Sequence, residues 1–169
     1  VCGELQLTTL APELIALFHR AYDGTQVDRG CAVARSAIGA LGSLGARAHD
    51  TYLVATRMVR LEPSGEGGVV DMAIPVRIGA AAALVETEGE DALFDVLPLL
   101  GDDQPEVRAG AAKAIGALPT TAAASALSVK LVAGDSNADV LGACLSGLLM
   151  IDGERFTPLV TSYLAHDDD

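Results

Sequence analysis

The sequence predicts an all-α fold, a right-handed α–α superhelix built from antiparallel helix pairs. Half of the 169 residues are hydrophobic, but only 4% are aromatic and Trp is absent. The apolar content is therefore mainly Ala, Leu and Val, whose small side chains let helices approach closely. The period-2 alternation of β-strands is not sustained anywhere, and a short motif around Val76 recurs around Val107 and Val140.

The recurring motif superposes without gaps in three segments, residues 75–81, 106–112 and 139–145. A fourth and weaker copy contains residues 37–41, which are identical to residues 114–118 and place Gly30 in the column of Val107. Self-similarity at such a nearly constant period is the signature of a repeat protein.

Each copy has the pattern of an amphipathic helix. In the third copy, Val107, Ala111, Ile115 and Leu118 are spaced to form one stripe of a helix with 3.6 residues per turn. Cys144 stands in a column that Ala fills in the other copies, so we expect it to be a buried packing residue.

The repeats divide the chain, as a single repeat domain over residues 1–169, into the following segments: a leading helix within 1–22 that begins near residue 5, a repeat over 28–61, an insertion over 62–72, and repeats over 73–101, 104–134 and 137–166. Each repeat is expected to contain two helices, with an aspartate near the start of the next one. The insertion is too rich in Gly for a helix, and we expect a loop. Such a loop can form part of a binding face, although a tolerated surface loop is the alternative.

Residues 102–116 resemble the pattern Asp-Asp-x-Pro-x-Val-Arg-x-x-Ala-Ala-x-Ala-Leu-Gly of HEAT and HEAT-like repeats. The resemblance covers roughly residues 28–169. It implies a solenoid in which the second helices line the concave side. In that family the turn Asp and the Arg six residues later form a ladder between neighbouring repeats.

The resemblance assigns this structural role between repeats to Asp71, Arg77, Asp102, Arg108 and Asp135. Leu141 stands where an Arg would follow Asp135, so we expect the ladder to be interrupted there.

The charge distribution suggests a protein partner rather than nucleic acid. With 11 Lys and Arg against 23 Asp and Glu, the net charge is −12 and a polyanion would be repelled. Residues 1–84 have a net charge of −1, and residues 85–169 have a net charge of −11. This asymmetry points to an acidic surface for a basic partner, with improved solubility as the alternative. The candidate partner-binding residues are Arg57, Arg60, Glu88, Glu90, Asp91, Asp95, Ser128 and Lys130.

The residues that could carry chemistry are scattered along the sequence. His19, His49 and His166 lie in different segments, and Cys2 is far from Cys31 and Cys144. We therefore expect no metal site, no cofactor, no disulfide framework and no enzymatic activity. The histidines near helix ends are expected to be solvated. An alternative left open is a bilin lyase or a related enzyme built from HEAT-like repeats.

No uncharged run reaches the roughly 20 apolar residues of a membrane span, and we expect a cytoplasmic protein that binds neither membrane nor nucleic acid. The chain ends at residues 167–169 with three aspartates, which match the Asp102-Asp103 turn that precedes a helix. We therefore expect a part of a longer array, with native capping ends as the alternative. The function that follows is a non-catalytic scaffold for protein–protein interaction.

Overall fold

The computed structural model describes residues 8–65 and 67–165 and divides into two compact units, Val1–Asp95 and Val96–Asp169. The expectations for Cys2, His166 and residues 167–169 lie outside the described residues. Both units consist mainly of helices packed in neighbouring pairs, which confirms the predicted all-α fold class. No helix in the described part has the length and apolar character needed to cross a bilayer.

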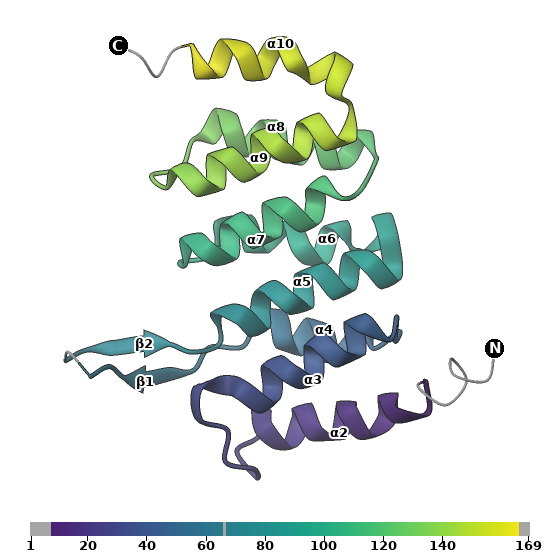
Figure 1. Cartoon of the computed structure of the whole chain (residues 1–169), viewed down its shortest axis with the longest axis vertical. Coiled ribbons are helices and arrows are strands. Elements are labelled where there is room, and N and C mark those ends of the chain that lie inside the picture. The colour runs from purple at the N-terminus through teal and green to yellow at the C-terminus, as the bar shows by residue number, and fades with distance from the viewer. Residues whose placement is uncertain (1–7, 66, 166–169) are drawn as a thin grey trace. The chain divides into compact units, whose positions relative to one another are not determined.

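The described part of the first unit is built around the α-helices α2 (Ala11–Tyr22), α3 (Ala32–Ser43), α4 (His49–Thr56) and α5 (Ile74–Glu88). Helix α3 packs between α2 and α5, and α4 packs against α5 (Figure 1). Short 3₁₀ turns precede α2 (Thr8–Leu10) and α3 (Arg29–Cys31).

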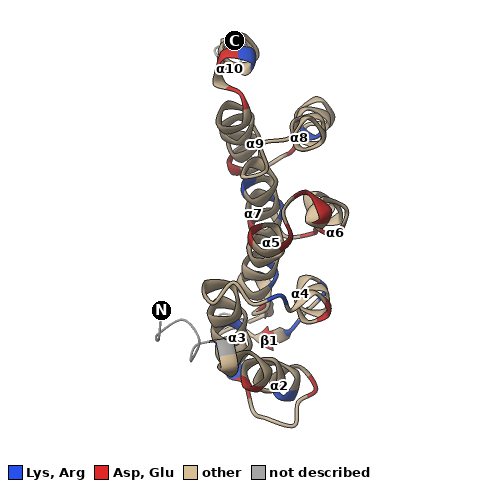
Figure 2. Cartoon of the chain, turned by 90° about the vertical axis from the view of Figure 1, so that its right-hand side faces the viewer, with Lys and Arg blue, Asp and Glu red and all other residues tan. Residues whose placement is uncertain are grey.

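The second unit contains α7 (Pro105–Gly116), α8 (Thr121–Ala133), α9 (Ala138–Ile151) and α10 (Gly153–Leu164). Helix α9 lies against α7, α8 and α10. Seen along the helix axes, α8 lies to one side of the layer that α7 and α9 form (Figure 2). Thus α8 buries one face against α9 and α7 and leaves the opposite face open.

The predicted stripe of the third copy forms the core of the second unit. Val107, Ala111 and Ile115 are fully buried, and Cys144 in the next copy is buried with them. Burial raises the pKa of the Cys144 thiol to about 11, so this sulfur behaves as an apolar packing group.

The fourth copy begins its helix later than its alignment implies. Gly30 and Cys31 have φ values of +64° and +52°, so α3 starts only at Ala32. A left-handed backbone cannot continue into a right-handed helix, and Gly30 therefore lies outside the stripe that it aligns with.

The second half of the repeat over 73–101 differs from the single helix that was expected. It consists of a 3₁₀ turn, η3 (Gly89–Ala92), a single turn, α6 (Leu93–Val96), and a second 3₁₀ segment, η4 (Leu97–Gly101). Pro98 lacks the N–H that a continuous α-helix would use, and Gly89 has a φ of +64° that ends α5.

The insertion is a β-hairpin rather than an irregular loop. Strand β1 (Leu61–Pro63) pairs antiparallel with β2 (Val69–Asp71), and Leu61 lies opposite Asp71. The glycines that suggested a loop form its turn, where Gly67 and Gly68 have positive φ values. The β-branched pair Val69-Val70 is suited to a strand, but such short strands cannot show a sustained period-2 alternation.

Helices α7 and α9 approach each other at two glycines. A Cβ on Gly116 would lie 2.6 Å from the Cα of Gly147, and a Cβ on Gly147 would lie 2.7 Å from Cδ1 of Leu127. Such contacts are too short for real atoms, so the two backbones touch because neither residue has a side chain.

Replacing Gly116 by Ala is expected to lower the free energy of unfolding by about 2 kcal/mol, because α7 and α9 must move apart. The control is Gly142→Ala in the same α9, where a Cβ meets nothing within 4 Å. It should be neutral or stabilise by up to about 1 kcal/mol, since Ala is the better helix former. Thermal or urea unfolding measures both changes, and equal stability of the two variants would contradict the close contact.

Candidate functional site

An aspartate side chain folds back on the backbone before each of three helices. The carboxylates of Asp71, Asp102 and Asp135 each accept a hydrogen bond from the backbone N–H two residues later, at 2.9 Å. These N–H groups belong to the residues that immediately precede α5, α7 and α9. The recurring aspartates therefore shape the turns in which the helices begin.

In the second unit, Asp135 is the centre of a charge cluster. Its carboxylate accepts from Nε and Nη2 of Arg108 at 2.7 and 2.8 Å and from Nζ of Lys130 at 2.9 Å, and its side chain is only 3% exposed. The bonds from Arg108 and Lys130 outweigh burial and hold the pKa of Asp135 far below its usual range. Arg108 also donates to the backbone oxygen of Asp102 at 2.8 Å. This guanidinium thus joins the turns before α7 and α9, which places Asp102, Arg108 and Asp135 together.

In the first unit, Asp71 forms the corresponding buried pair with Arg77. Nη1 of Arg77 donates to Asp71 Oδ2 at 2.6 Å and to the backbone oxygen of Met58 at 2.7 Å. Burial alone would raise the pKa of Asp71, but the N–H groups of Arg60 and Ala73 and the guanidinium of Arg77 lower it overall. This pair ties α5 to the end of α4 and to β2.

Two of the basic side chains proposed to bind a partner are engaged within the fold. Arg60 donates from Nη2 to the backbone oxygens of Ala21 and Tyr22 at 3.1 and 3.3 Å, at the negative end of the α2 dipole. Lys130 is held by Asp135, as described above. Arg57 is exposed and follows the last residue of α4. The role of Arg60 depends on residues distant in the sequence, which local spacing does not reveal. Lys130 is bound by an aspartate only five residues later, but this contact requires the turn after α8 to bring Asp135 back to the helix.

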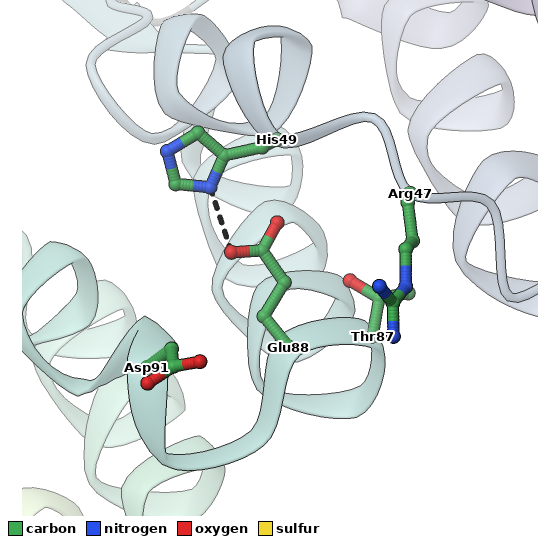
Figure 3. Close-up of a pocket in the computed structure, with 5 residues that line it drawn as sticks. All are labelled: Arg47, His49, Thr87, Glu88 and Asp91. Atoms are coloured by element: carbon green, nitrogen blue, oxygen red, sulfur yellow. Dashed lines mark hydrogen bonds and ion pairs between the residues drawn. The ribbon is translucent and has the colours of Figure 1, made fainter.

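Two acidic candidates of the first unit, Glu88 and Asp91, line a hollow of about 320 Å³ together with Arg47, His49 and Thr87 (Figure 3). His49 lies 2.8 Å from Glu88 through Nδ1 and 4.0 Å from Asp95 through Nε2. His49 was expected to be merely solvated, and no pattern in the sequence indicated its contact with the distant Glu88. Glu90 and Asp91 are exposed in the segment that follows α5, where Figure 2 shows acidic residues gathered.

The predicted residue Ser128 lies in a second hollow, of about 340 Å³, on the surface of α8. Its other lining residues are Val129, Val132 and Ala133, and the side chains of Val129 and Val132 are 68% and 90% exposed. Sequence reasoning missed both valines. The available signal was their position on α8 opposite Leu127 and Leu131, which are buried.

Two of the polar groups that line the first hollow are hydrogen-bonded within the fold, His49 to Glu88 and Thr87 to its own helix. The hydroxyl of Thr87 in the first hollow donates to the backbone oxygen of Ala83 at 2.7 Å, within its own helix. Among the described residues, no group of three or more His, Cys, Asp or Glu side chains is placed to hold a metal ion.

Comparison with protein families identifies the repeat. Residues 69–148 match the family model of HEAT repeats, which confirms the predicted resemblance to HEAT-like repeats. The matched stretch extends from β2 to α9 and includes the turns of Asp71, Asp102 and Asp135. No curated protein matches the chain.

Asp135→Asn is expected to destabilise the protein by about 2 kcal/mol at pH 7, because it weakens charge-assisted hydrogen bonds from Arg108 and Lys130. The folded-state pKa of Asp135 is depressed, so its stabilising effect is present above the unfolded-state pKa of about 3.9. The effect is lost as the pH falls toward the folded-state value.

The difference between the wild type and Asp135→Asn should therefore narrow between about pH 5 and about pH 3 in urea unfolding experiments. Asp103→Asn is the control, because Asp103 is exposed and contributes only its backbone oxygen to Arg108. A loss of stability in Asp135→Asn that is constant over this pH range would contradict the role of the carboxylate.

Proposed function

Because residues 69–148 match the family model of HEAT repeats, we propose that the chain is a non-catalytic scaffold that binds another protein through the exposed face of α8. HEAT repeats commonly mediate protein interactions. The observation that carries the proposal is the composition of this face.

All of α8 is described, and none of its exposed side chains is charged. They are Thr121, Ala122, Ser125, Val129, Val132 and Ala133. Lys130, the charged residue of the helix, is turned toward Asp135, and its side chain is 16% exposed. On a chain in which 20% of residues are charged, this is an unusual solvated helix face.

The geometry of this face suits a partner's side chains. Ser128 with Val132 and Val129 with Ala133 form two rows at a spacing of four residues, and the hollow lies along them. Rows of this spacing are the ridges and grooves by which protein surfaces pack on helices. Covering the two exposed valines would remove apolar surface from water, which is the main source of affinity in the centre of an interface.

The other hollow contains a histidine and carboxylates, which are the groups used in acid–base catalysis. Their contacts nevertheless favour a role in binding. His49 is hydrogen-bonded to Glu88, and the hydroxyl of the neighbouring Thr87 donates to the backbone oxygen of Ala83. We therefore assign no reaction to this hollow and treat Asp91, which lines it, and the neighbouring exposed Glu90 as a surface for a basic partner.

Val129→Asp combined with Val132→Asp should weaken partner binding at least tenfold, because two carboxylates would be desolvated in the interface. The partner would be captured with the wild-type chain, identified by mass spectrometry, purified and titrated calorimetrically. Val27→Asp is the matched control, since Val27 is 83% exposed in the first unit. Equal affinities of the wild type and the double variant would reject α8 as the binding face.

If the partner is basic, Asp91→Lys should lower its association rate on the order of threefold and reduce the dependence of that rate on salt. Asp23→Lys makes the same change of charge at another exposed position of the first unit and should have a smaller effect. Glu88 is less suitable for this test because it is held by His49. Stopped-flow measurements at several ionic strengths distinguish the variants, and identical salt dependences would leave the acidic residues with a role in solubility.

A further inference from the structure

In the hairpin of the first unit, the segment that forms β1 has an inverted pattern of polar and apolar side chains. The hairpin projects beyond the helices α3 and α5 that flank it (Figure 1). In sheets with one solvated face, apolar side chains normally point inward and polar ones outward. Residues 59–63, which lead into β1 and form it, show the opposite arrangement.

The even-numbered side chains of this segment attach it to the unit. Arg60 reaches the end of α2 through its guanidinium, as described above. Glu62 accepts a hydrogen bond from the backbone N–H of Gly30 at 2.9 Å. The base of the hairpin is fixed further by Asp71, whose carboxylate accepts from the N–H of Arg60 at 3.0 Å. The hairpin is thus held in place by polar contacts.

The odd-numbered side chains are apolar and face solvent. Val59 is 62% exposed and Leu61 is 61% exposed, and Pro63 is exposed as well. Val69, which lies opposite Pro63 in β2, is 66% exposed. Asp71, which lies opposite Leu61, is buried, so the exposed apolar side chains of this face are Val59, Leu61, Pro63 and Val69. Apolar side chains exposed together on an anchored hairpin are typical of a surface that binds another molecule.

The backbone of β1 is also available on its outer edge. At the two ends of the hairpin, Met72 N–H donates to the oxygen of Arg60 and Ser64 N–H donates to the oxygen of Gly68. Because bonding alternates along an antiparallel pair, Leu61 directs its N–H and C=O away from β2. No described residue bonds to this N–H. Pro63 has no N–H, but at this edge position no hydrogen bond to β2 is lost.

We propose that β1 binds an extended segment of a partner protein, which adds as an antiparallel strand along residues 59–63. Its backbone would pair with Leu61, and its apolar side chains would continue the outer face of Val59 and Leu61. This surface belongs to the first unit and goes beyond the role proposed for α8.

Charge complementarity defines the ends of this segment. Arg57 is exposed at the start of the edge, and Val59, Leu61 and Pro63 are uncharged. A strand antiparallel to β1 places its C-terminal end beside Arg57, so an acidic residue there would form an ion pair. Residues 1–84 have a net charge of only −1, so this part of the chain does not repel such a segment as the strongly acidic remainder would.

The probe is the peptide acetyl-Thr-Val-Thr-Val-Thr-Glu-amide, titrated into the full chain and followed by amide chemical shifts. We expect saturable binding with a Kd of about 1 mM or lower, shifts centred on Leu61, and slowed hydrogen exchange of its N–H. N-methylation of alternate peptide residues should abolish binding in one register and spare it in the other, because only one set of amides faces β1. This comparison leaves the protein unchanged.

Variants of the protein complete the test. Leu61→Pro removes the outward N–H and should weaken binding about tenfold relative to Leu61→Ala, which keeps it. Arg57→Glu should remove the preference for a peptide ending in Glu over one ending in Lys, whereas Arg35→Glu on α3 should not. The Val129→Asp and Val132→Asp variant should bind the peptide normally, which separates this surface from α8. Absence of binding, or equal binding by both N-methylated peptides, would overturn the proposal.

Discussion

The fold depends on a buried carboxylate that precedes a helix in each unit. An ionised side chain is stable away from water only when hydrogen bonds and opposite charges replace its hydration. Asp71 and Asp135 meet this requirement with the N–H groups of their own turns and with Arg77 and Arg108. Each aspartate therefore fixes both the conformation of a turn and the position of a neighbouring segment. The helices that follow, α5 and α9, begin where these contacts place them.

The same contacts determine which charges remain available at the surface. Asp135 holds Lys130, so α8 presents an uncharged face with two exposed valines. Asp71 anchors the base of the hairpin, so the outer side of β1 can be apolar without loss of its position. The strongly acidic chain thus has two apolar surfaces of different geometry, a helix face and a strand edge, in separate units. Such a combination is suited to a protein that binds more than one segment.

The small side chains serve the packing in a specific way. Gly116 and Gly147 bring the backbones of α7 and α9 into contact, and in the first unit a Cβ on Gly42 would lie 3.3 Å from the Cβ of Ala83. Large apolar residues at these positions would force the helices apart and expose the stripes that they bury. The abundance of Ala and Gly therefore reflects the short distance between neighbouring helices.

The sequence by itself determined the repeat, the helical fold, the buried stripe from Val107 to Leu118 and the aspartate of each turn. These features are local, since a helix face and a turn are set by residues within a few positions of each other. Only the tertiary structure decided that Lys130 and Arg60 serve the fold, that His49 meets Glu88, and that Val129 and Val132 are exposed. The contacts of Arg60 and His49 join residues that are distant in the sequence, and the contact of Lys130 depends on the conformation of the turn after α8. The exposure of the two valines depends on which face of a uniformly apolar helix is covered. The hairpin could not be predicted from the sequence, because its strands are too short for the alternation of their side chains to be recognised.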